Sequence, residues 1–319
     1  MTKHLDLARE AKAEFLGSMP ASYMDQALDV RAFAEAIGQP PPPLVSAGVC
    51  RAGKKFGLMA FAMTPEQAHY AKSRAPKGIP FEVRVMPGIH ARITREFAQQ
   101  KQRPLIIGQQ IRPHGAPWVG TGGLYVPSAD RRACLQVTNS HVVGLRAQAG
   151  TPMTQGGEVY GYVYRNNGIV IGGVQEVDVA SVAVIQGLEG YFDWESGIDD
   201  VLAGIESVTP DDLDQGFTNT GQTRGTMFGN CIAIEIDGQP IGYDEGHAWL
   251  NNLSAYAKPG VGEFSVAGHS GSTIVRVSDR KAKSLLFAGG PDSNGDDITF
   301  GCDLPKAILA AGGLVEVFR

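Results

Sequence analysis

Apolar residues near the N-terminus recur at helical spacing, at Leu5, Ala8, Ala11 and Phe15 and again at Leu28, Phe33 and Ile37. Because side chains three or four positions apart share one face of a helix, residues 3–37 are predicted to form two helices. The prolines at residues 40–43 favour a stiff, extended linker after the second helix. Residues 1–43 are therefore predicted to be a helical segment and linker, which either packs on the body of the protein or docks a regulatory partner or a second copy of the chain.

The pattern becomes mixed over residues 44–101. Residues 44–49 and 55–62 are largely apolar and are predicted to be strands on either side of a tight turn. Pro65 marks the first turn of a helix, and residues 81–85 alternate between apolar and charged positions as a half-buried strand does. This order of elements predicts a small α/β subdomain over residues 44–101.

From residue 102 to residue 319 the pattern is mainly β. A first group of strands is predicted at residues 120–126, 135–139, 158–164, 168–175 and 177–184, and a second group at residues 206–208, 226–236, 248–254, 273–277, 283–288 and 298–300. Short strands separated by turn signals are typical of a sandwich or a barrel. A helix over residues 304–311 is predicted to close the chain.

Composition narrows the classes of function. A length of 319 residues predicts about two domains. The net charge of −5 and the scattered basic residues argue against a nucleic-acid partner. The chain holds no apolar stretch of 18 residues, so no membrane-spanning helix is predicted.

The cysteines and histidines give no sign of a metal site or a cofactor. Cys50, Cys134, Cys231 and Cys302 form no C-x-x-C pair, and the histidines outside the motifs discussed below lack metal-ligand spacing. The N-terminus opens on charged residues and lacks the apolar run of a signal peptide. Reduced thiols and a cytoplasmic location are therefore expected.

The candidate chemistry lies in three short motifs. Ser270 stands between Gly268 and Gly271, His141 ends the stretch Thr-Asn-Ser-His, and Asp178 opens a predicted strand between them. A serine hydroxyl is a weak nucleophile and needs a general base, which histidine supplies and an aspartate orients. Each motif alone is weak evidence in a glycine-rich chain, but together they indicate a nucleophilic hydrolase.

The order of the three residues selects among the known triads. The order His141, Asp178, Ser270 is that of the chymotrypsin-type double β-barrel. An α/β-hydrolase needs its histidine after the serine, and no histidine follows His269. The segment before His141 also lacks the alternating strands and helices of a subtilisin-like sheet. In the favoured arrangement, the backbone N–H groups of Gly268 and Ser270 would bind the oxyanion.

Further motifs give the chain a resemblance to the trypsin-like serine peptidases, specifically their cytosolic bacterial branch. The motifs that carry it are residues 120–122 (Gly-Thr-Gly), 137–143 around His141, 178–180 (Asp-Val-Ala), 220–225, 268–272 (Gly-His-Ser-Gly-Ser) and 286–290. The match covers residues 102–319, and residues 44–100 resemble a small unit that precedes the protease in that branch. The resemblance implies a chymotrypsin-like double β-barrel that hydrolyses a protein or peptide substrate.

The resemblance also suggests how the site departs from its relatives. His269 stands where the family usually has an aspartate that pairs with a newly formed N-terminus, which argues against activation by N-terminal cleavage and puts the order of the oxyanion loop in question. By resemblance, Phe264 lies near the base of the primary specificity pocket and Ala288, Gly289 and Gly290 lie along its wall. Because no acid stands at Phe264, a small or apolar substrate residue is expected.

Three functions are compatible with this pattern. The first is a serine endopeptidase that cleaves a protein partner. The second is a catalytically degenerate protease-fold module that only binds partners, although such a module has no need of His141, Asp178 and Ser270 together. The third is a small-ester hydrolase on the same barrels.

Overall fold

The computed structural model describes residues 2–20, 43–92, 94, 105, 107–185, 202–221, 223–260 and 262–317. The first predicted helix is confirmed as α1 (Thr2–Gly17). The second predicted helix and most of the proline run lie outside the described residues, as do residues 95–104, which hold the proposed boundary between the small subdomain and the barrels. Among the described residues, no helix has the length and apolar character needed to cross a membrane.

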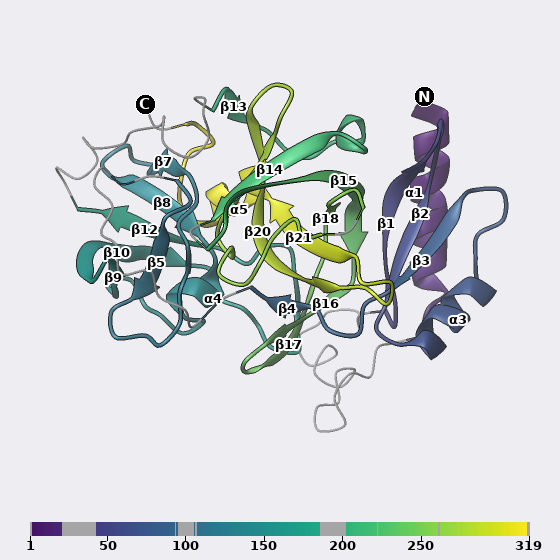
Figure 1. The fold of residues 1–319 in the computed structure, drawn as a ribbon, viewed down its shortest axis with the longest axis horizontal. Helices are drawn as coiled ribbons and strands as arrows, with labels where there is room; N and C mark the ends of the chain where they lie inside the picture. The colour runs from purple at the N-terminus through teal and green to yellow at the C-terminus, as the bar shows by residue number, and fades with distance from the viewer. Residues whose placement is uncertain are drawn as a thin grey trace.

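Seven strands form the first barrel, seen in blue and teal in Figure 1. They are β5 (Gln110–Pro113), β6 (Gly120–Thr121), β7 (Tyr125–Pro127), β8 (Cys134–Thr138), β9 (Pro152–Gln155), β10 (Glu158–Asn166) and β12 (Ala180–Val184). Antiparallel pairings run from β6 through β5, β9, β10, β12 and β8 to β7. Only residues 122–124 separate β6 from β7, so these two strands act as one interrupted strand that closes the ring.

Six strands form the second barrel, drawn in green and yellow in Figure 1. They are β14 (Gly216–Gly221), β15 (Gly225–Asp237), β18 (Leu253–Ala257), β19 (Thr273–Arg276), β20 (Lys281–Pro291) and β21 (Asp297–Asp303). They pair antiparallel in the cyclic order β14, β15, β18, β21, β20, β19 and back to β14. The fold is therefore a chymotrypsin-like double β-barrel, as the order of the motifs predicts.

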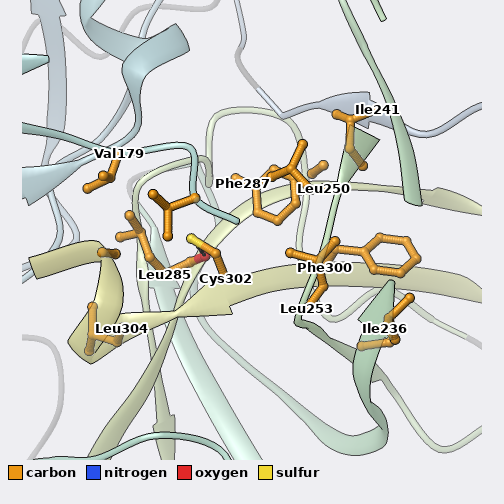
Figure 2. Packing of buried hydrophobic residues seen from close by; sticks show 14 of the residues in the cluster. Val179, Ile236, Ile241, Leu250, Leu253, Leu285, Phe287, Phe300, Cys302 and Leu304 are labelled. Atoms are coloured by element: carbon orange, nitrogen blue, oxygen red, sulfur yellow. Dashed lines mark hydrogen bonds between the residues drawn. The ribbon is translucent and has the colours of Figure 1, made fainter. Parts of the chain in front are cut away.

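The largest hydrophobic core joins the two barrels. Val179, which follows Asp178, belongs to the same buried cluster as Leu285 of β20 and Leu304 of the closing helix α5 (Leu304–Ala310). Figure 2 shows Val179, Leu285 and Leu304 in this cluster, with Phe287 and Phe300 farther along it. Because protein interiors are close-packed, this shared core fixes the first barrel against the strand β20 of the second.

The predicted ββαβ unit is confirmed as β1 (Ser46–Ala52), β2 (Lys55–Ala62), α3 (Pro65–Ser73) and β3 (Phe81–Val85). The side-chain hydroxyl of Thr64 caps α3 by accepting a hydrogen bond from the backbone N–H of Gln67. The strand β1 pairs with β2 on one side and with β15 of the second barrel on the other. The unit therefore extends the sheet of the second barrel, at the right of Figure 1.

The helix α1 packs on this extension. Phe15 and Met19 belong to one buried cluster with Leu58 and Ala60 of β2, and Lys12 forms an ion pair with Asp237 at 2.7 Å. The first helix is thus part of the body of the protein, which was one of the two roles expected for it.

Several short strands were not predicted from the sequence. The most important for the site is β4 (His90–Ala91), which lies between β20, antiparallel to it, and β16 (Gln239–Tyr243), parallel to it. The predicted strand over residues 248–254 is in fact split between β17 (Gly246–Leu250) and β18. The predicted strand over residues 168–175 is strand only at β11 (Val174–Gln175), because Gly168 and Gly172 adopt positive φ and turn the chain.

Candidate active site

His141 and Asp178 meet at the end of the first barrel. His141 lies in the short helix α4 (Ser140–Val143), directly after β8, and Asp178 lies just before β12, which pairs with β8. The Nδ1 atom of His141 is 2.5 Å from Oδ2 of Asp178, and both side chains are almost fully buried. The backbone N–H of Ser140 donates to Oδ1 of Asp178 at 2.8 Å, which holds the carboxylate in place.

A third group holds the same carboxylate. The hydroxyl of Tyr243, at the end of β16, donates to Oδ2 of Asp178 at 3.1 Å. Burial, followed by the nearby charge of Asp178, raises the pKa of Tyr243 well above its usual value, so the phenol stays protonated as a donor. No sequence motif marks Tyr243, because its role depends on how a distant hairpin folds over the first barrel.

The nucleophile loop is tied to the first barrel through β6. The backbone N–H of Thr121 donates to the carbonyl of Ser270 at 2.7 Å, and the Thr121 hydroxyl donates to the carbonyl of Gly268 at 2.6 Å. A Cβ atom placed on Gly120 would lie 2.4 Å from Val142 and 3.0 Å from the Ser270 carbonyl oxygen. The neighbour of His141 and the backbone of Ser270 therefore face the same glycine, which explains the Gly-Thr-Gly motif.

The hydroxyl of Ser270 is not bonded to His141 in this structure. It donates instead to the carbonyl oxygen of Phe287 at 2.9 Å, and Nε2 of His141 is buried without a hydrogen-bond partner among the described residues. A hydrogen bond between Ser270 and His141 thus requires the Ser270 hydroxyl to leave the carbonyl of Phe287. Hydrogen bonds of catalytic groups are often long or misaligned before a substrate is in place.

Two backbone N–H groups converge beside Ser270, as a candidate oxyanion hole requires. The N–H of Gly268 and the N–H of Ser270 donate to one oxygen atom, the carbonyl of Arg92, at 2.7 and 3.1 Å. Gly268 has a φ of +94°, and a Cβ atom at this position would lie 2.5 Å from Oγ1 of Thr223. Glycine is therefore required for the turn that directs both donors to the same point.

His269 is buried and anchors this loop. Its Nδ1 lies 2.8 Å from Oδ1 of Asn219, whose amide nitrogen donates to the carbonyl of Phe264 at 2.6 Å. The amide oxygen therefore faces the imidazole, so Nδ1 of His269 must carry the proton. Burial, with the charges of Arg92 and Arg224, lowers the pKa of His269 to about 4. A neutral histidine thus orders the loop in place of an aspartate.

Of the four residues expected to form the specificity pocket, Gly289 lies against the side chain of Arg92, and the other three have different neighbours. A Cβ atom on Gly289 would lie 2.4 Å from Nε of Arg92, so the glycine leaves room for the guanidinium. Phe264 is fully buried and stacks on Tyr256, with 5.5 Å between the ring centroids. Ala288 pairs with Ala91 of β4, and a Cβ atom on Gly290 would contact the backbone of Gly88.

Two further residues of this pocket were missed from the sequence. The guanidinium of Arg92 forms an ion pair with Asp297 at the start of β21, and it also donates to the carbonyl of Ser265. Asp297 lies far from the position of Phe264 in the chain, and only the pairing of β20 with β21 brings it to the pocket.

A cleft of about 540 Å³ opens beside His141, between Trp118, in the connection from β5 to β6, and Tyr243 of β16. Among the described residues, no group of three or more His, Cys, Asp or Glu side chains is arranged to hold a metal ion.

No family model matches the chain, and no curated protein matches it. The solved structures to which the chain is similar include three proteases. A Nocardiopsis protease (NAPase) is 17% identical with a TM-score of 0.48, and the alignment covers 67% of this chain and 98% of that one. Thermobifida fusca protease A is 16% identical with a TM-score of 0.47, covering 67% and 98%. Cellulomonas bogoriensis chymotrypsin is 16% identical with a TM-score of 0.46, covering 66% and 97%.

Proposed function

We propose that the protein is a serine endopeptidase that cleaves a protein partner through an acyl-enzyme, with Ser270 as nucleophile, His141 as general base and Asp178 as the group that orients His141. The observation that carries the proposal is the convergence of the Gly268 and Ser270 N–H groups on a single carbonyl oxygen. Donors at 2.7–3.1 Å from the reacting oxygen are the geometry that stabilises a developing oxyanion.

The chemistry begins with rotation of the Ser270 side chain from the carbonyl of Phe287 towards Nε2 of His141. His141 removes the proton as Ser270 attacks the substrate carbonyl carbon, and it later returns the proton to the leaving amine. Asp178 holds the tautomer that keeps Nε2 free to accept, and it stabilises the imidazolium. Each oxyanion donor contributes about 10²–10³ in kcat in enzymes of this kind.

The other two candidate functions predict different behaviour. A binding module would not need His141 held at 2.5 Å from a buried carboxylate, because ordering that pair serves proton transfer. A small-ester hydrolase would use the same triad but would not cleave an amide bond in a folded partner. Four buried thiols favour a reducing compartment, so we propose that the protein acts in the cytoplasm.

The proposed regulatory partner, or second copy of the chain, would use the exposed face of the N-terminal segment. Leu7 of α1 is 44% exposed, whereas the opposite face of the helix is packed against β2. A Leu7→Glu variant tests this proposal by light scattering, alone and with a substrate protein. If α1 mediates assembly, the molar mass of the particles should be lower for the variant than for the wild-type chain.

The triad is tested by covalent labelling with a fluorophosphonate probe. The carbonyl of Arg92 occupies the oxyanion position, and the Arg92 side chain anchors that segment to Asp297. Labelling is therefore measured in the wild-type chain and in an Arg92→Ala chain, which lacks the anchor. Ser270→Ala should abolish labelling and peptide hydrolysis in both backgrounds. The matched control is Ser272→Ala, because Ser272 is also a buried serine in the same loop and should leave labelling intact. Labelling that survives Ser270→Ala, or that is absent from both backgrounds, would contradict the proposal.

A further inference from the structure

The chain places one of its own segments across the candidate active site. The carbonyl oxygen of Arg92 accepts the two hydrogen bonds of the oxyanion hole, from Gly268 at 2.7 Å and from Ser270 at 3.1 Å. This is the position that the carbonyl of a bond about to be cleaved must occupy. The carbonyl carbon of Arg92 is therefore presented to the Ser270 loop as the reacting atom of a substrate would be.

The backbone before Arg92 is held as an extended strand. In β4, Ala91 pairs with Ala288 and His90 pairs with Gly289, both antiparallel to the pocket strand β20. The N–H of Arg92 donates to the carbonyl of Phe287 at 3.2 Å. A peptide added to a sheet edge in this way is bound through its main chain, while its side chains enter pockets.

The backbone beyond Arg92 is held on the side of the first barrel. Thr94 and Val119 exchange two hydrogen bonds, with the N–H of Thr94 donating at 3.1 Å and the N–H of Val119 donating at 2.8 Å. The segment therefore contacts the second barrel before Arg92 and the first barrel after it. A substrate must do the same to reach residues from both barrels.

The side chain of Arg92 occupies a pocket that fits it. Its guanidinium is paired with Asp297, and the side chains of both residues are only 10% exposed. Burial raises the pKa of Asp297, and the charge of Arg92 opposes that shift. A buried carboxylate without a partner is costly, so the pocket is built for a cation, and Gly289 leaves the space through which the guanidinium reaches it.

We propose that the protein cleaves its own chain at the peptide bond between Arg92 and Ile93, and that the same pocket selects arginine in other substrates. This inference rests on the proposed function. It replaces the expectation of a small or apolar residue, which considered the position of Phe264 and did not include Asp297.

The reaction is a hydrolysis that consumes one water molecule. The Ser270 oxygen bonds to the carbonyl carbon of Arg92 while its proton passes to His141. The bond from that carbon to the nitrogen of Ile93 then breaks, and His141 protonates the departing amine. Water hydrolyses the resulting ester, which leaves a carboxylate on Arg92, a new amino terminus on Ile93 and a regenerated Ser270.

Self-cleavage at this bond would act by opening the site. The residue before Ser270 is His269, which is held by Asn219, and not a carboxylate that could pair with a new N-terminus. The oxyanion loop is already ordered in the uncleaved chain, so cleavage is needed only to release the segment whose Arg92 carbonyl occupies the oxyanion position.

Intact-mass spectrometry and N-terminal sequencing of the purified full-length chain test the proposal. Wild-type protein should yield one fragment that ends at Arg92 and one that begins at Ile93. Ser270→Ala and Arg92→Gln should each remain a single chain, with circular dichroism confirming that they are folded. The matched control is Arg74→Gln, because Arg74 is an exposed arginine of the same N-terminal region and its replacement should leave cleavage unchanged.

Failure of this inference and failure of the proposed function give different results. An intact wild-type chain, together with an Arg92→Gln chain that labels with a fluorophosphonate at Ser270, would overturn self-cleavage and leave the peptidase standing. Absence of labelling in every variant would overturn both. Cleavage at another bond, or cleavage that persists in Ser270→Ala, would also overturn the inference.

The arginine preference has its own test in trans. In the processed protein, a fluorogenic peptide with arginine before the cleaved bond should be hydrolysed at least ~10-fold faster than its glutamine counterpart. Asp297→Asn should abolish this preference, with circular dichroism confirming that the variant is folded. The neighbouring Asp296→Asn is the matched control, because Asp296 pairs with Arg84 and not with the pocket. A preference that is absent, or that survives Asp297→Asn, would overturn the assignment of the pocket.

Discussion

At the scale of single residues, the neutral state of His269 in the oxyanion loop makes the stability of the folded protein depend on pH. The folded protein holds this imidazole in a buried site where its pKa is about 4, whereas an unfolded chain binds a proton near pH 6.5. Between these values the unfolded state binds more protons than the folded state. The stability that comes from a neutral His269 is therefore complete above about pH 6.5 and is lost as the pH falls towards 4.

We predict that replacing His269 flattens the pH dependence of stability. In the wild-type chain, this one residue should lower the free energy of unfolding by on the order of 3 kcal/mol between pH 7 and pH 4. His269→Gln keeps an amide that can donate to Asn219 but removes the titration. Urea unfolding at several pH values measures the difference, with His69→Gln on the exposed face of α3 as control. An unchanged slope in His269→Gln would contradict the role assigned to its burial.

Tyr243 is predicted to be a positioning residue for the triad. Tyr243→Phe removes the hydroxyl that donates to Asp178 and should lower kcat by about 10-fold with little change in KM, because the lost bond holds the carboxylate and not the substrate. The pH profile of kcat should shift as well, since the carboxylate loses a donor that stabilises its charge. Tyr162→Phe, at an exposed tyrosine of β10, is the control. Equal kcat and pH profiles for both variants would show that Tyr243 only fills space.

At the scale of elements, α1 contributes to stability through one face. Phe15 lies in the buried cluster over β2, and the centroid of its ring is 5.2 Å from the ring centroid of Phe81 in β3. Phe15→Ala should lower the free energy of unfolding by about 3–5 kcal/mol, whereas Leu7→Ala on the exposed face should change it little. Chemical denaturation measures both. Equal effects would mean that the buried face of the helix does not support the sheet.

Some elements of the fold can be predicted from sequence patterns, and others cannot. Most of the barrel strands could be predicted from local periodicity, although β5, β9 and β14 were missed. The motifs of His141 and Ser270 could be recognised because the chemistry of their side chains is specific. The roles of Arg92 and Asp297 could not, because they arise from pairings of β4 with β20 and of β20 with β21. A strand of two residues, such as β4, carries no periodicity that a sequence pattern can reveal.

At the scale of the whole molecule, the N-terminal region and the second barrel share one sheet. The pairing of β1 with β15, and the cluster beneath α1, do not involve the bond after Arg92. After self-cleavage the two fragments should therefore remain associated. They should elute as one species in size-exclusion chromatography and separate only in denaturant. Elution as two species under native conditions would show that the covalent link was needed to hold the sheet together.

The shared sheet has a consequence for any outside substrate. A fragment retained through β1 keeps its own Arg92 close to the pocket that it has just left, at an effective concentration that is commonly in the millimolar range for short tethers. The new carboxylate of Arg92 would then compete with every incoming peptide for Asp297 and the oxyanion donors. Substrates that bind weakly would not displace the fragment, and those that also bind the surface outside the cleft would be favoured. After its own peptide bond has been hydrolysed, the retained fragment would thus limit cleavage to substrates that bind tightly enough to displace it.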